Sequence, residues 1–169
     1  MLALDDIKIL DLSRMPPLAY CAMILADLGA EVIKIEAPFE PDVPIFGTGY
    51  SPHPQQEEAK EQAAYNPLNR NKKSITLNLK SEEARQVFYR LVEKADVVVE
   101  GFRPGVAERI GIGYEAVSRA NPRIVYCSLT GYGQDGPYRD LPGHDINYIS
   151  TAGFLGLNGE SGGPPNAEV

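Results

Sequence analysis

The sequence predicts an open, doubly wound α/β fold, in which a parallel sheet carries helices on both faces. Short β-branched runs alternate along the chain with segments whose apolar residues recur at helical spacing. Two of the short runs are apolar enough for strands buried on both faces. Strands that alternate with helices imply parallel pairing with right-handed crossovers, and ligands of such sheets bind at the carboxyl ends of the strands.

The first third of the chain predicts a strand, a helix and a second strand. Residues 7–13 (IKILDLS) and 31–36 (EVIKIE) are the strands, and apolar spacing over residues 18–28 predicts a helix that ends before Gly29. This helix is apolar nearly all round, so we expect it to be covered on more than one side, with a subunit interface as one possible cover. Residues 38–69 are rich in proline and predict a long irregular excursion.

The next segment predicts a strand followed by a capped helix. Residues 74–79 (SITLNL) alternate like a strand, and Ser81 followed by Glu82 and Glu83 supplies a helix cap and an acidic first turn. The apolar residues that follow lie on one helical face, which places four of them in the core: Val87, Phe88, Leu91 and Val92.

The remaining elements complete the alternation. Residues 97–100 (VVVE) and 124–129 (IVYCSL) predict strands buried on both faces, with helical segments over 104–110 and 114–120. Residues 153–169 form no recognisable element. Because a compact domain rarely ends in this way, we interpret 1–169 as one domain or most of one, continued in a longer protein.

Composition narrows the function classes. The chain has 169 residues, 43% hydrophobic and 23% charged, with a formal net charge of −7. That charge argues against a nucleic-acid surface. No segment resembles a membrane span or a signal peptide, so we expect a cytoplasmic protein with no membrane partner. Cys21 and Cys127 are predicted to be buried thiols, and with two histidines they offer no metal-binding spacing.

Positive charge gathers in two places despite the acidic total. One is the cluster Arg70, Lys72, Lys73 and Lys80, which is either a solvated basic face or an anion site; the other holds Arg103 and Arg109.

The segment EGFRPG (100–105) directly follows a predicted strand, which makes it either an anion site or an ordinary strand-to-helix turn. Neither a Walker loop nor a dinucleotide-binding glycine pattern is present, since the first loop reads SRMPPLA.

Residues 130–150 predict a shaped loop rich in glycine and proline. In it His144 stands beside Asp145. An imidazole next to a carboxylate suits acid and base chemistry near neutral pH, whereas the alternative is a histidine that braces the loop.

Six collinear segments together resemble family III CoA-transferases, the CaiB/BaiF family. They are ILDLS, CAMILADLGAEVIKIE, NRNKKSITLNLKS, ADVVVEGFRPGVAERIGIGY, NPRIVYCSLTGYGQDGP and GHDINY. The resemblance covers nearly the whole chain and implies a Rossmann-like N-terminal part of the family's large domain. It also implies coenzyme A and acyl-CoA as substrates, with no tightly bound cofactor and no metal.

The resemblance carries a set of coenzyme A contacts onto this chain. In it, residues 77–80 hold the adenine and ribose end, 101–103 make the next contacts, and Arg109 meets the phosphates. These residues are Leu77, Asn78, Leu79, Lys80, Gly101, Phe102, Arg103 and Arg109. The chain departs from the family at 16–21, where many members have a glycine-proline pair, and at Ala37, where several have an arginine against the adenine.

The resemblance implies transfer of coenzyme A between carboxylic acids through an aspartyl anhydride. The aspartate nucleophile is expected a few residues beyond Val169, so we expect this chain alone to be inactive. The complete enzyme is expected to be an interlocked homodimer.

Two other readings remain open. In the racemase branch, His144 is one of two bases, Asp145 orients it or holds a helix end, and Tyr132 and Gln134 line the acyl pocket. The other alternative is a non-catalytic coenzyme A-binding module, which keeps Lys80, Arg103 and Arg109.

Overall fold

A computed structural model describes residues 1–38, 66–160 and 162–164 of the chain. The chain divides into two compact units, Met1–Leu129 and Thr130–Val169. The predicted excursion over 38–69 lies mostly outside the described residues, and its end forms the short helix η1 (Pro67–Asn69). In the described ranges, no helix has the length and apolar character needed to cross a membrane.

The first unit is built on a five-stranded parallel sheet with the strand order β3-β2-β1-β4-β5. The strands are β1 (Lys8–Leu12), β2 (Glu31–Glu36), β3 (Lys72–Thr76), β4 (Val97–Glu100) and β5 (Val125–Ser128). The order runs outward from β1 to β3 and then restarts on the other side of β1 at β4. This topological switch confirms the doubly wound α/β fold.

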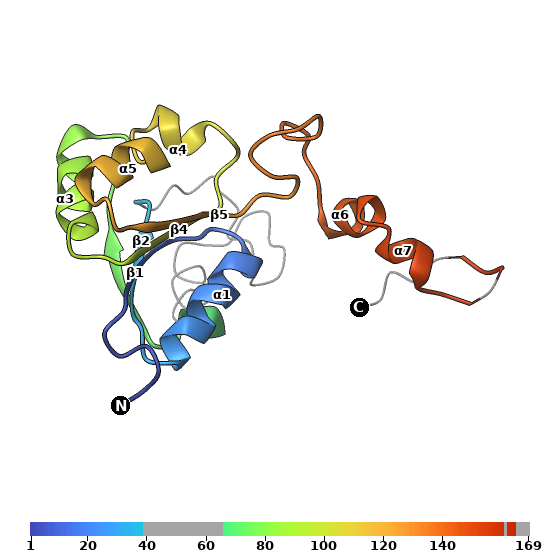
Figure 1. The fold of residues 1–169 in the computed structure, drawn as a ribbon, viewed down its shortest axis with the longest axis horizontal. Helices are drawn as coiled ribbons and strands as arrows, with labels where there is room; N and C mark the ends of the chain where they lie inside the picture. Colours follow the sequence, from blue (N-terminus) through green and yellow to red (C-terminus); the bar gives the residue numbers. More distant parts are fainter. Residues whose placement is uncertain (39–65, 161, 165–169) are drawn as a thin grey trace, which may run out of the picture. The chain divides into compact units, whose positions relative to one another are not determined.

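Helices cover the two faces of the sheet unequally (Figure 1). Helix α1 (Pro16–Asp27) lies on one face, and α3 (Glu82–Val92), α4 (Val106–Arg109) and α5 (Tyr114–Ala120) lie on the other. Each face buries its own apolar cluster. On the α3 side Phe88, Val92 and Val117 meet Leu10 and Val98, whereas on the α1 side the helix packs on the other surface of the same strands.

Local sequence signals place most boundaries correctly. Strands β2 and β4 have the predicted bounds. The Ser81 hydroxyl accepts a hydrogen bond from the Ala84 amide at 3.2 Å and caps α3 as predicted. The predicted strand over 74–79 is displaced: β3 ends at Thr76, because the Leu79 amide bonds back to the Leu77 carbonyl at 3.1 Å and turns the chain.

Strand β5 is not buried on both faces as predicted. It is the edge strand of the described sheet, and Val125 is 61% exposed. The prediction of buried thiols is also wrong, since both cysteines are free and exposed. Cys127 lies on this edge strand, and Cys21 lies on the outer side of α1.

Two further predictions need correction. In α3, Phe88 and Val92 are fully buried, but Val87 and Leu91 are only half-buried. The segment 153–169, predicted to lack regular structure, contains the short helix α7 (Phe154–Leu157). The predicted cover of α1 on more than one side stays a prediction; within the described residues α1 leaves Tyr20 and Ile24 exposed.

Candidate functional site

The turn between β3 and α3 presents polar groups outward and apolar groups inward. The Leu77 amide still donates to the Glu36 carbonyl of β2 at 2.9 Å, and the Asn78 carbonyl accepts from the Ser81 amide at 2.8 Å. Leu77 and Leu79 pack against the α3-side core, whereas Asn78 and Lys80 are exposed. The turn is therefore fixed at its base and open at its tip.

The turn after β4 is organised by a buried carboxylate. Glu100, 3% exposed, accepts hydrogen bonds from the Phe102 amide at 2.7 Å and from the Ser128 hydroxyl. These bonds hold Phe102, which packs partly against the α3-side core. Gly105 begins α4 at φ 80°, in the left-handed region that favours glycine. Glu100 forms part of the sequence motif, but its role as the organiser of the turn was not predicted.

Gly101 follows β4 at the switch point of the sheet, where a methyl group would make only ordinary van der Waals contacts. A methyl group on Gly101 would lie 3.6 Å from Leu18 Cδ2 and 3.7 Å from the Leu129 carbonyl oxygen. Leu18 is 3% exposed and belongs to the core on the α1 side. The chain therefore packs a leucine side chain against the backbone of this turn.

The structure separates the cations of the sequence into two kinds. Arg70 pairs with Asp27, Lys72 with Asp11, and Lys73 with Glu31. The hydrogen bond from Arg70 lowers the pKa of the Asp27 carboxyl below its ordinary value. Three members of the predicted basic cluster thus pair with carboxylates of the fold, and of these Lys72 is buried in its pair whereas Arg70 and Lys73 lie at the surface.

Arg103 and Arg109 are the second kind. Both are exposed, and no carboxylate of the described residues lies within ion-pair distance of either guanidinium. Arg103 belongs to the turn after β4, and Arg109 ends the short helix that follows. Guanidinium groups that are exposed and unpaired retain all five donors for a phosphate.

Several residues outside the predicted set brace these segments. The Tyr89 hydroxyl donates to the Gly111 carbonyl, and the Tyr126 hydroxyl donates to the Ile112 carbonyl at 3.0 Å. Burial raises the pKa of both phenols, so they stay protonated donors. Arg85 reaches the carbonyl oxygens of Leu79 and Lys80. In the sequence, the sign of these contacts is that Arg85 and Tyr89 are four residues apart and therefore lie on one side of the helix, next to its buried face.

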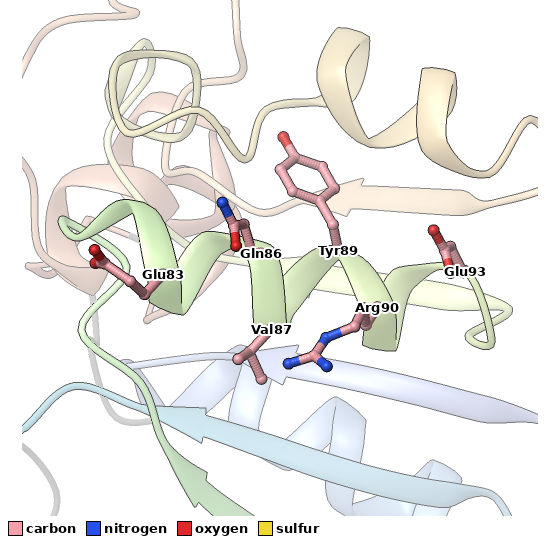
Figure 2. A pocket seen from close by; sticks show the side chains of 6 residues that line it. All are labelled: Glu83, Gln86, Val87, Tyr89, Arg90 and Glu93. Carbon is pink, nitrogen blue, oxygen red and sulfur yellow. The ribbon is translucent and has the colours of Figure 1, made fainter.

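The outer surface of α3 has a depression, shown in Figure 2. It is lined by Glu83, Gln86, Val87, Tyr89, Arg90 and Glu93. Five of these residues belong to α3 and Glu93 follows its last residue, and the depression is open to solvent. Figure 2 shows Val87 and Arg90 leaving the helix on one side and Tyr89 on the other. This surface is not part of the candidate site.

The second unit carries the predicted acid and base pair. His144 is the N-cap of α6 (Asp145–Thr151), and its amide donates to Asn147 Oδ1 at 2.8 Å. Asp145 lies in the first turn of α6, where its carboxylate interacts favourably with the helix dipole. The side chains of His144 and Asp145 are both exposed. This placement supports a helix-end role for Asp145.

Aromatic packing shapes the loop before α6. The ring of Tyr148 lies 5.0 Å from that of Tyr132, and its hydroxyl donates to the Gly143 carbonyl at 2.7 Å. A methyl group on Gly131 or Gly143 would lie 2.1 or 2.6 Å from Tyr148 Cε1, so either would displace the Tyr148 ring. The predicted loop over 130–150 is shorter than expected, because residues 145–150 belong to α6. Tyr132 lies in the aromatic cluster and Gln134 is exposed.

The fold and site are those of a doubly wound α/β protein in which two guanidinium groups after the inner strand β4 pair with no carboxylate of the described residues. The chain belongs to CoA-transferase family III, whose family model matches residues 4–168. This result confirms the resemblance found in the sequence.

Named relatives agree with the family model. An acyl-CoA transferase from Fusarium pseudograminearum is 44% identical over 174 residues, which cover 96% of this chain and 36% of that protein. Human alpha-methylacyl-CoA racemase is 37% identical over 168 residues, which cover 99% of this chain and 38% of that protein.

A solved relative has the same fold. The crystal structure of a CAIB/BAIF family protein from Brucella suis superposes with a TM-score of 0.80 at 35% identity, covering 99% of this chain and 43% of that chain. The chain therefore spans less than half the length of each of these relatives.

Proposed function

We propose that this chain is the coenzyme A-binding, N-terminal part of the large domain of an enzyme that transfers coenzyme A between carboxylic acids. The observation that carries the proposal is the separation of the cations. Arg70, Lys72 and Lys73 each pair with a carboxylate, whereas Arg103 and Arg109 are exposed and pair with no carboxylate of the described residues. A ligand with several phosphate charges needs such donors.

The apolar and polar groups of the two turns suit the rest of the ligand. Leu77, Leu79 and Phe102 are half-buried and offer apolar surface to a purine, and Asn78 offers amide groups to the ribose end. All three apolar residues pack against one core cluster, so the two turns share a common base. Lys80 and Gly101 complete the proposed set.

Chemistry in this proposal begins with a carboxylate that attacks the thioester carbonyl and expels the coenzyme A thiolate, leaving an acyl anhydride. The thiolate then attacks the enzyme's own carbonyl of the anhydride, which forms an aspartyl-CoA thioester and releases the first acid as a carboxylate. The second carboxylate attacks this thioester and expels the thiolate, and the thiolate opens the new anhydride at the substrate carbonyl, giving the new acyl-CoA and the free aspartate. We place the nucleophile beyond Val169, so this chain supplies binding and the downstream segment supplies catalysis. We also propose a cytoplasmic enzyme that works as an interlocked homodimer, for which the exposed Tyr20 and Ile24 of α1 offer apolar surface.

Arg109→Ala is expected to lower the affinity of this chain for coenzyme A by more than about tenfold, a loss near 1.4 kcal/mol. Titration calorimetry measures it. Arg123→Ala is the matched control. Arg123 is also exposed, but it precedes β5 and therefore lies at the amino ends of the parallel strands, away from the proposed site. Equal losses in the two variants would mean that only net charge matters, and a wild-type chain that folds without binding coenzyme A would overturn the proposal.

A racemase is the second candidate, favoured by the exposed His144 at the start of α6 and by the human relative's name. It predicts that the complete translation product exchanges the α-proton of a 2-methylacyl-CoA for deuterium in D₂O, and that His144→Ala slows this exchange at least about 100-fold, as expected for a general base. Our proposal predicts instead no exchange and transfer to free carboxylic acids. Mass spectrometry of the recovered thioester distinguishes the two.

A further inference from the structure

Arg85 in the first turns of α3 is bound to the backbone of the turn before the helix. Its Nη1 donates to the Leu79 carbonyl at 3.2 Å and to the Lys80 carbonyl at 3.0 Å. Its Nη2 pairs with Glu82, and the side chain is 24% exposed. One guanidinium therefore closes the turn that presents Asn78 and Lys80.

The same side chain lies beside the turn that follows α4. Gly111 has φ +78°, and a methyl group on it would lie 3.5 Å from Cδ and 3.8 Å from Nε of Arg85. This turn also accepts hydrogen bonds from the hydroxyl groups of Tyr89 and Tyr126. Arg109 lies two residues before Gly111, so Arg85 is bonded to the 77–80 turn and lies beside the segment that carries Arg109.

We propose that Arg85 is a positioning residue for coenzyme A, one that sets the 77–80 turn relative to Arg109 without touching the ligand. The inference rests on the function proposed above, in which the turn receives the adenine and ribose end and Arg109 receives phosphate. A ligand that spans both segments binds tightly only if their spacing is set before it arrives. Lysine cannot replace this arginine, because one ammonium group lacks the planar fork that serves two carbonyls and Glu82 together.

The test measures coenzyme A affinity by calorimetry for the wild-type chain, Arg85→Met and Arg85→Lys. It also measures hydrogen exchange of the Lys80 and Ser81 amides in the free proteins. Arg85→Met is expected to weaken binding about tenfold and to speed exchange at both amides. Arg85→Lys keeps the charge and is expected to stay within about threefold of the methionine variant. The control is Arg90→Met, an exposed arginine of the same helix, which is expected to bind within about twofold of wild type.

The outcomes separate this inference from the proposed function. A wild-type chain that does not bind coenzyme A overturns both. If the wild-type chain binds and Arg85→Met binds within twofold of it, the inference alone is overturned. Full recovery of affinity in Arg85→Lys also overturns it, because the residue would then act through its charge. Weaker binding with unchanged amide exchange also overturns it. If the methionine variant does not fold, the lysine variant decides: loss of affinity supports positioning, and wild-type affinity refutes it.

Discussion

Lys72→Met is expected to destabilise the fold by about 3–5 kcal/mol, because it leaves a buried carboxylate without its partner. The side chains of Lys72 and Asp11 are 1% and 0% exposed, and Nζ lies 2.8 Å from Oδ2. The ammonium also donates to the Ala19 carbonyl at 2.9 Å, and the other Asp11 oxygen accepts from the Ser13 amide at 2.8 Å. The pair thus joins β1, β3 and α1. Urea denaturation followed by circular dichroism measures the loss.

The neighbouring lysine is a matched control. Lys73 pairs with Glu31 on the surface, where the side chains are 71% and 36% exposed, so Lys73→Met is expected to cost no more than about 1 kcal/mol. The double variant Asp11→Asn/Lys72→Met removes the buried charge together with its partner and should recover part of the loss. Similar stabilities for the two single lysine variants would contradict the assignment of Lys72 as a structural cation.

The lysine pair also shows what the sequence could not reveal. Lys72 and Lys73 are adjacent and chemically identical, and the sequence groups them in one basic cluster. Their difference depends on partners supplied by β1 and β2, together with the alternation that sends adjacent strand residues to opposite faces. Pairing between distant segments is a tertiary property, so charge patterning alone cannot separate a structural cation from a binding one.

Elements with local signals were predicted well. The Ser81 cap, the apolar run of β4 and the glycine after α1 each involve neighbours in sequence, and they appear where predicted. The exposure of β5 and of Cys127 depends on which strand forms the edge, which no local pattern encodes. The apolar run of β5 therefore predicts a buried strand as strongly as the apolar run of β4 does.

The site residues themselves stay predictions. The sequence marked the turn after β4, which contains Arg103, and Arg109 in the helix that follows, and both guanidinium groups are exposed and pair with no carboxylate of the described residues. Arg85 was missed because its contacts are to backbone carbonyls, which any sequence supplies. Because every residue has a backbone carbonyl, the sequence does not show which carbonyls a side chain will bind, and such contacts are seen only in the folded structure.

Phe88→Ala is expected to destabilise the first unit by about 3–5 kcal/mol, whereas Val87→Ala should cost about 1 kcal/mol or less. Both residues were predicted to lie in the core from the same helical spacing. Phe88 is 0% exposed and packs with Val92 against the sheet, so its removal leaves a cavity. Val87 is half-buried and lines the open depression along α3 (Figure 2), where solvent fills the space of the lost methyl groups.

Chemical denaturation of both alanine variants tests the difference. Because Phe88 anchors the helix that carries Arg85, its loss should also weaken coenzyme A binding at temperatures where the fold persists, whereas Val87→Ala should leave binding unchanged. A loss of stability for Val87→Ala as large as that for Phe88→Ala would mean that the outer side of α3 is covered in solution. The helical periodicity would then have identified a buried face that the described residues leave open.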